Sequence, residues 1–203
     1  MAGERGLFIT FDGQHGAGKT YNINNLNAVL IAASYPVVCL KEPSYSTIGN
    51  IARQSEETMV PEAVACLFAA DRYQQCKEIE NELALGKIVL CDRYFISALI
   101  LQNIDGLEFD FIRQLNSKII KPDLAIVVYA QKDIILERIK KKNITRFTKI
   151  EMQEPFDRYV KHRREIEVTI KNVKYFPNNY ESDAKTIADY VLAFVSAKTG
   201  ETK

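Results

Sequence analysis

The sequence predicts an α/β fold in which a parallel β-sheet of about five strands is flanked by helices. Short, continuously apolar runs that end at turn residues are typical of strands buried on both faces of a sheet. Longer segments with apolar residues at helical spacing separate these runs. The chain has 203 residues, 47% of them hydrophobic, and can bury one substantial core, so we expect a single domain over residues 1–203.

The strands are expected where the apolar runs occur. Four of these runs span residues 7–11, 37–40, 88–91 and 124–129, and a fifth candidate, an edge strand, spans 173–176. Each run is followed by turn-forming or charged residues. Alternation with helices implies that the strands lie parallel.

Helices are expected between the strands. Apolar spacing predicts them at about 19–35, 61–85, 95–102, 109–120, 133–142 and 184–197, with a further amphipathic segment that runs to about residue 171. Pro61 suits the first turn of the second of these helices, and Gly86 suits its C-terminal stop.

Charge and composition exclude several classes of protein. Lys and Arg total 27 and Asp and Glu total 26, so the formal net charge is +1. A nucleic acid polymer or an anionic membrane usually requires a partner with a clear basic excess. No run of about 18 uncharged apolar residues occurs, and residues 1–6 lack the order of a secretory signal. We expect a cytoplasmic protein that binds no nucleic acid polymer and no membrane.

The four cysteines show no metal-binding or redox spacing. Cys39, Cys66, Cys76 and Cys91 are far apart, and no C-x-x-C pair or Cys/His cluster is present. We therefore expect reduced thiols in the core rather than disulfides or zinc ligands.

The segment from 13 to 20 carries the clearest motif, because it fits the pattern G-x-x-x-x-G-K-[ST] between a strand and a helix. Glycines let the backbone curl so that N–H groups face phosphate oxygens, and the helix N-terminus adds positive charge. Lys19 would bridge the β- and γ-phosphates, and the Thr20 hydroxyl would bind Mg²⁺. This predicts a P-loop NTPase fold, with ATP-binding residues Gly13, Gln14, His15, Gly16, Ala17, Gly18, Lys19 and Thr20.

The phosphate loop alone does not separate a GTPase, an ATPase motor and a small-molecule kinase. No guanine-reading Asn-Lys-x-Asp is present, and the third strand ends in Asp92-Arg93-Tyr94 rather than in the acidic pair of motor ATPases. Ligands of open α/β sheets bind at the C-terminal ends of the strands. There Asp92 would orient Mg²⁺ or the acceptor, and Arg93 would neutralise a phosphate. A buried structural ion pair is the alternative.

From about residue 7 to residue 163 the chain resembles the thymidylate kinase family, P-loop enzymes that transfer the γ-phosphoryl of ATP to thymidine monophosphate. The resemblance rests on Phe11-Asp12-Gly13, Lys41-Glu42-Pro43, the segment 67–72 (LFAADR), the segment 86–94 (GKIVLCDRY), Ser97 and Gln102, Lys121-Pro122-Asp123-Leu124, and Lys149-Ile150-Glu151 with Phe156. It implies a nucleoside monophosphate kinase that uses ATP and Mg²⁺, forms a homodimer, and closes a helical lid at about 140–158.

The resemblance also implies roles for individual residues. Phe68 would stack on the acceptor base, and Arg72 would reach the base edge or the acceptor phosphate. Without the family, Phe68 on an apolar helical stripe would be a core residue. A family arginine after the Glu-Pro pair corresponds to Arg53. The residues expected to contact the acceptor are Glu42, Phe68, Arg72, Arg93, Ala98 and Leu101.

A basic segment precedes the C-terminal strand. Residues 138–164 contain ten Lys or Arg and three Asp or Glu. A solvated basic helix face is one interpretation, but phosphoryl transfer depends on cations around the transferring group. Bacterial-type thymidylate kinases have a glycine in the middle of the loop, as Gly16 is here, and compensate with lid arginines. We expect Arg146 and Lys149 to act in transfer together with Lys19, Asp92 and Arg93.

Several positions depart from the family pattern. His15 replaces an acidic residue associated with the acceptor sugar, and Ala98 and Leu101 replace a small polar residue and a tyrosine. Ser44-Tyr45-Ser46 stands where the family has Gly-Gly-Thr, and Tyr21 stands where Thr or Ser is usual. Thymidine monophosphate remains the leading acceptor. The alternatives are another or modified pyrimidine nucleotide or nucleoside, or a nucleotide-binding homologue weakened in catalysis.

Overall fold

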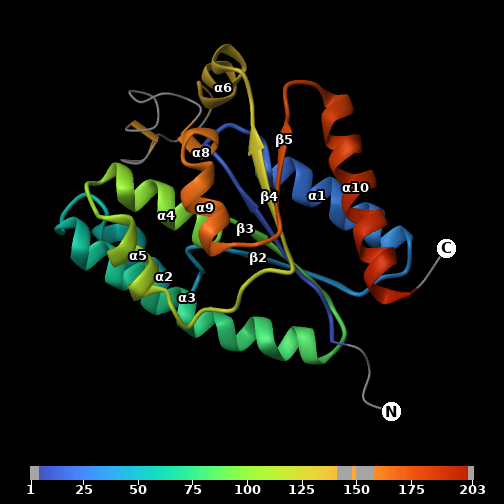
Figure 1. The fold of residues 1–203 in the computed structure, drawn as a ribbon, viewed down its shortest axis with the longest axis horizontal. Helices are drawn as coiled ribbons and strands as arrows, with labels where there is room; N and C mark the ends of the chain where they lie inside the picture. The colour runs from blue at the N-terminus through green and yellow to red at the C-terminus, as the bar shows by residue number, and fades with distance from the viewer. Residues whose placement is uncertain (1–4, 141–147, 150–157, 201–203) are drawn as a thin grey trace.

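The computed structural model describes residues 5–140, 148–149 and 158–200, which are arranged around one five-stranded sheet (Figure 1). The strand order is β2-β3-β1-β4-β5, and every pairing is parallel. The strands are β1 (Phe8–Asp12), β2 (Val37–Lys41), β3 (Ile88–Asp92), β4 (Leu124–Tyr129) and β5 (Val173–Pro177). The predicted α/β fold, a parallel sheet flanked by helices, is confirmed.

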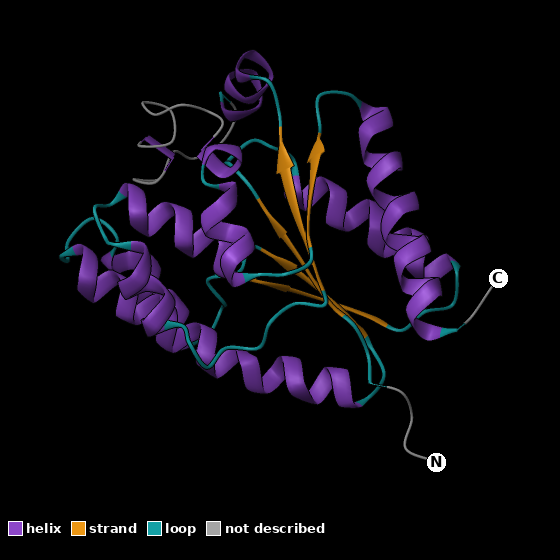
Figure 2. Cartoon of the chain, in the orientation of Figure 1, coloured by secondary structure: helices purple, strands orange, loops and turns teal. Residues whose placement is uncertain are grey.

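Helices cover both faces of the sheet (Figure 2). They are α1 (Lys19–Ala32), α2 (Thr47–Ser55), α3 (Pro61–Ala84), α4 (Phe95–Ile104), α5 (Phe109–Leu115), α6 (Lys132–Ile139), α8 (Arg158–Lys161), α9 (Arg163–Thr169) and α10 (Glu181–Thr199). α1 and α10 pack together on one face, and α3, α4, α5 and α9 lie on the other. α2 packs against α3.

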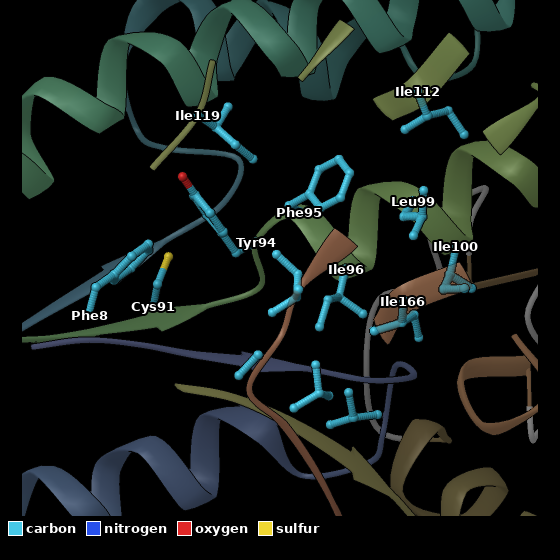
Figure 3. Packing of buried hydrophobic residues seen from close by; sticks show 14 of the residues in the cluster. Phe8, Cys91, Tyr94, Phe95, Ile96, Leu99, Ile100, Ile112, Ile119 and Ile166 are labelled. Atoms are coloured by element: carbon cyan, nitrogen blue, oxygen red, sulfur yellow. The ribbon is translucent and has the colours of Figure 1, made fainter. Parts of the chain in front are cut away.

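The core has one hydrophobic cluster on each face, because successive strand residues point to opposite sides of a sheet. Phe8 belongs to the cluster under α3 and α4, whereas Ile9 belongs to the cluster under α1 and α10. Figure 3 shows the first cluster, in which the Phe8 and Tyr94 rings meet edge to face with centroids 4.9 Å apart. The Tyr94 hydroxyl donates a hydrogen bond to the Ile120 carbonyl at 2.9 Å.

Two burial expectations are wrong. β2 lies at the edge of the sheet, where only one neighbouring strand covers it, and its residues are half-buried or exposed. Cys39 on this strand and Cys66 on the outer side of α3 are exposed, whereas Cys76 and Cys91 are buried as expected. All four cysteines are free thiols, as predicted.

Several helix boundaries differ from the predicted ones. α1 ends at Ala32 rather than near residue 35, because Ser34 has a positive φ of 65° that no α-helix can continue. α5 ends at Leu115 rather than near residue 120, because Asn116 at its end turns its side-chain amide back to the Ile112 carbonyl. α2 was not predicted, although Ser46 accepts a hydrogen bond from the Gly49 N–H, as an N-cap residue does.

From residue 158 on, where the structure describes it, the segment predicted to run to about residue 171 forms the helices α8 and α9, which meet at His162. α6 ends at Ile139. The predicted lid at about 140–158 lies almost entirely outside the described residues. Within the described parts of the chain, no helix combines the length and the apolar character that crossing a membrane requires.

We expect the fully buried face of α4 to make a large contribution to stability. Leu99 is 0% exposed, so Leu99→Ala should lower the free energy of unfolding by about 3 kcal/mol through lost contacts and a residual cavity. Leu85 is 67% exposed, and the chemically identical change Leu85→Ala should alter the free energy of unfolding by no more than about 0.5 kcal/mol. Urea denaturation of both variants measures the difference, and equal losses would contradict the assigned packing.

Candidate active site

The C-terminal ends of β1 and β3 lie next to each other and begin the site. The parallel register pairs Phe11 with Asp92, so the segments that follow the two strands leave the sheet together. The buried Asp12 joins them, because its Oδ1 accepts hydrogen bonds from the backbone N–H groups of Tyr94 at 3.0 Å and Ser97 at 2.8 Å. This carboxylate fixes the start of α4 to the start of the phosphate loop.

The phosphate loop follows β1 and needs glycine for steric reasons. Gly13 has φ 136°, and a Cβ there would lie 2.0 Å from the Val128 carbonyl oxygen. Gly18, at the start of α1, has φ 94° and packs against Asn178, which would lie 2.1 Å from an added Cβ. The Asn178 amide also donates to the Ala17 carbonyl at 2.7 Å. The loop is therefore held tightly between β4 and the end of β5.

The two predicted phosphate-binding cations, Lys19 at the start of α1 and Arg93 directly after β3, converge on this loop. Lys19 Nζ donates to the carbonyl oxygens of Gly13 at 2.9 Å and Gln14 at 2.8 Å. Arg93 Nη1 donates to the same Gly13 oxygen at 3.2 Å. Arg93 has a positive φ of 72°, uncommon for a residue other than glycine and frequent at functional sites. The structure thus brings Lys19 and Arg93 within reach of one anion.

The two predicted metal-binding residues are in direct contact. Thr20 Oγ1 donates a hydrogen bond to Asp92 Oδ2 at 2.6 Å. Hydroxyl and carboxylate oxygens are the ligands that Mg²⁺ prefers, and Mg²⁺ at nucleotide sites takes most of its other ligands from phosphates and water. No group of three or more His, Cys, Asp or Glu residues suited to a metal occurs in the described residues. The donor set therefore fits a nucleotide-bound Mg²⁺.

A cavity of about 300 Å³ opens beside the phosphate loop, between the loop after β2 and the helices α3 and α4. His15 from the phosphate loop contributes to its wall. All six residues predicted to contact the acceptor line it: Glu42, Phe68, Arg72, Arg93, Ala98 and Leu101. Phe68 thus faces the cavity rather than the closed core.

A buried ion pair forms one wall of this cavity. Arg72 is 3% exposed, and its Nε and Nη2 lie 2.8 and 2.7 Å from Glu42 Oε2. Its Nη1 donates to Asn116 Oδ1 at 2.6 Å, and its guanidinium lies over the Tyr94 ring, 5.7 Å from the centroid. A buried guanidinium requires such partners, because burial otherwise penalises its charge.

The loop after β2 is held from α3 by adjacent charged residues. Arg72 holds Glu42, and Asp71 accepts hydrogen bonds from the Ser44 N–H at 2.6 Å, from the Ser44 hydroxyl, and from the Ser46 hydroxyl at 2.8 Å. Arg53 donates to the Ser44 carbonyl at 2.7 Å from the other side and also lines the cavity. The departure from Gly-Gly-Thr thus supplies hydroxyl contacts to α3.

Gln102 is one of the residues that carry the family resemblance, but no role was predicted for it. It lines the cavity, is 3% exposed, and neither atom of its amide has a hydrogen-bond partner among the described residues. Its spacing of four from Ala98 places both on one face of α4, which is the signal that could have identified it. A buried amide without partners is costly unless a ligand satisfies it.

The two predicted lid cations are not tested by this geometry. Arg146 lies outside the described residues. Lys149 is exposed, and its Nζ lies 3.8 Å from Glu57 Oε1 at the surface, outside the wall of the cavity. Their assignment to phosphoryl transfer stays a prediction.

The environment of Glu42 predicts an unusual pH dependence of stability. Burial raises the pKa of Glu42 from 4.5 to about 7, with Asp12 and Asp71 adding to the rise and Arg72 opposing it. The folded chain therefore binds the Glu42 proton more tightly than the unfolded chain does. The stabilisation from this proton is complete below about pH 4.5 and is lost as the pH rises through about 7.

Glu42→Gln keeps a neutral group at this position at every pH. The free energy of unfolding of the natural chain, relative to this variant, should therefore fall between about pH 5 and about pH 8. Denaturant unfolding of both proteins at several pH values measures this difference in the free energy of unfolding. Parallel pH profiles of the two proteins would mean that the pKa of Glu42 is not raised.

Comparison with known proteins agrees with this geometry. The family model described as thymidylate kinase matches residues 11–184. A probable thymidylate kinase of Pyrococcus horikoshii is 39% identical over 156 residues, which cover 72% of this chain and 76% of that protein. A probable thymidylate kinase of Methanocaldococcus jannaschii is 36% identical over 141 residues, covering 68% and 72%. A thymidylate kinase of Nitratidesulfovibrio vulgaris is 33% identical over 154 residues, covering 71% and 72%.

The matched region spans the phosphate loop, the cavity and the strand ends that join them. The resemblance noted from the sequence motifs is therefore confirmed, and the chain belongs to the thymidylate kinase family.

Proposed function

We propose that this chain is an ATP-dependent nucleoside monophosphate kinase that transfers the γ-phosphoryl group of ATP to thymidine monophosphate. One observation carries the proposal: the cavity lined by the six predicted acceptor residues reaches Arg93, which also contacts the phosphate loop. An acceptor in the cavity and a donor on the loop would then meet at one cation. Membership of the thymidylate kinase family supports thymidine monophosphate as the acceptor.

The residues at this junction suit in-line phosphoryl transfer, in which the protein mainly positions the reactants and stabilises charge. Lys19 would exchange its loop carbonyl partners for the β- and γ-phosphates. Arg93, held near Gly13, would neutralise charge on the transferring group. Arg146 and Lys149 would add positive charge from the lid, which would also exclude water.

Thr20 and Asp92 would hold a Mg²⁺ ion bound to the nucleotide, through the hydroxyl and carboxylate oxygens that now contact each other. The ion would neutralise negative charge on the phosphate oxygens. By the family resemblance we also propose that the chain forms a homodimer and acts in the cytoplasm. Sedimentation analysis would test the dimer.

The cavity wall supports a base with a carbonyl group at position 4. Phe68 offers an aromatic face on which a pyrimidine can stack, and Gln102 offers one donor and one acceptor for the imide edge. An amide can turn to suit either a carbonyl or an amino group, but Arg72 can only donate. Thymine presents carbonyl oxygens to such donors, whereas the 4-amino group of cytosine opposes them.

The test is ADP release with a panel of acceptors at saturating ATP. We expect the highest kcat/KM with thymidine monophosphate, and a value at least about tenfold lower with deoxycytidine monophosphate, because the 4-amino group of cytosine cannot accept a hydrogen bond from the N–H groups of Arg72 that face the acceptor. A higher kcat/KM with a different or modified pyrimidine nucleotide would reassign the acceptor. ATP binding without turnover on any member would favour a homologue that only binds nucleotides.

Lys19→Ala tests the phosphate loop. Lys19 Nζ donates to the loop carbonyls of Gly13 and Gln14, and its substitution removes no apolar contact of the core clusters, so the variant should fold while kcat with thymidine monophosphate falls about 100-fold or more. Lys198→Ala, at an exposed position near the end of α10, is the matched control and should leave kcat unchanged. Steady-state kinetics measures both, and a Lys19→Ala enzyme with kcat within about tenfold of the natural one would contradict the role.

A further inference from the structure

Arg72 is held by two partners that come from different parts of the chain. Glu42 from the end of β2 accepts a hydrogen bond from Nε and lies 2.7 Å from Nη2 as an ion pair, and Asn116 from the end of α5 accepts a hydrogen bond from Nη1. A guanidinium has five N–H donors in a fixed plane. Beyond these contacts with described residues, one N–H of Nη1 and one of Nη2 are left for a ligand.

Asn116 is buried deeply and holds a defined orientation. It is 0% exposed, its Oδ1 accepts from Arg72 at 2.6 Å, and its Nδ2 donates to the Ile112 carbonyl at 2.8 Å. Turning the amide over would place its N–H₂ against the donors of Arg72 and its oxygen against a carbonyl. The α5 backbone therefore sets the direction from which Arg72 is held.

The neutral charge of Asn116 matters at this position. Glu42 already supplies one buried carboxylate to Arg72, and Asp12 and Asp71 lie close enough to raise the pKa of Glu42. A further carboxylate in place of Asn116 would make this wall more negative, which opposes the binding of an anionic nucleotide. An amide holds the guanidinium without adding charge.

The attachment of α5 to α3 does not depend on Asn116 alone. The Tyr73 hydroxyl, next to Arg72 on α3, donates to the Leu115 carbonyl at 3.0 Å and accepts from the Lys118 N–H at 3.2 Å. Tyr94 binds the Ile120 carbonyl, and Figure 3 shows its hydroxyl directed toward the segment around Ile119. These contacts hold the segment in place, so the hydrogen bond of Asn116 to Arg72 can be tested separately.

We propose that Asn116 is a positioning residue for acceptor recognition, which holds the buried Arg72 so that its two remaining N–H groups face the acceptor in the cavity. Asn116 does not line the cavity and acts only through Arg72. The inference rests on the proposed function, because it assigns to Arg72 the binding of the nucleoside monophosphate.

The test measures kcat and both KM values with ATP and thymidine monophosphate. Asn116→Ala should raise the KM for thymidine monophosphate about tenfold, the size of a lost hydrogen bond to a charged group, with kcat and the KM for ATP within about twofold of the natural values. Tyr73→Phe removes hydrogen bonds to the same segment but keeps the hydrogen bond between Asn116 and Arg72. This control should leave kcat and both KM values within about twofold of the natural values. Asn116→Ser leaves a smaller cavity than Asn116→Ala, but the serine side chain is too short to bridge Arg72 and the Ile112 carbonyl. It should therefore give the same kinetic result as Asn116→Ala, and it is the variant to measure if Asn116→Ala does not fold.

A double-mutant cycle separates positioning from general stabilisation. In an Arg72→Lys background, which lacks the planar fork, Asn116→Ala should raise the acceptor KM by no more than about twofold further. An equal increase in both backgrounds, or an equal increase in the KM for ATP, would overturn the proposal. No turnover by the natural chain would overturn the proposed function and this inference together, whereas turnover with an unchanged acceptor KM in Asn116→Ala would overturn this inference alone.

Discussion

The parallel pairing of β1 with β3 is the constraint on which the rest of the site depends. It places the phosphate loop beside Asp92 and Arg93, although Asp92 lies 72 residues from Thr20 and Arg93 lies 80 residues from Gly13 in the chain. The buried Asp12 strengthens this junction by accepting two backbone hydrogen bonds from the start of α4. Because the same helix carries Ala98, Leu101 and Gln102, one strand register aligns the donor side and the acceptor side.

A second constraint is the charge of Arg72 in the interior. Burying this guanidinium is favourable only because Glu42 and Asn116 satisfy it from two directions, and each belongs to a different element of the fold. Asp71 beside it holds the loop that follows Glu42. The acceptor cavity is therefore shaped by polar contacts that also connect α3, α5 and the end of β2. The side chains that shape the acceptor cavity therefore also stabilise the fold.

Local patterns predicted the elements where one physical cause dominates. Apolar runs located all five strands, and the phosphate loop was identified because close backbone packing at Gly13 and Gly18 excludes other residues. Patterns failed where a neighbour decides the outcome. The apolar run of β2 resembles a central strand, yet β2 lies at the edge. Apolar spacing continues past α5, yet the Asn116 side chain ends the helix.

By itself the sequence determined the fold class, the phosphate loop and the set of residues that the family resemblance assigns to the acceptor. These follow from short-range causes: residue spacing, glycine geometry and motifs of contiguous residues. Only the tertiary structure decided that the six acceptor residues share one cavity, that Thr20 contacts Asp92, and that Asn116 holds Arg72. It also showed that the buried Gln102 amide has no hydrogen-bond partner within the described parts of the chain. Such contacts depend on strand order and helix packing, which bring together residues that are far apart in the sequence. Local sequence patterns do not predict which of these residues meet.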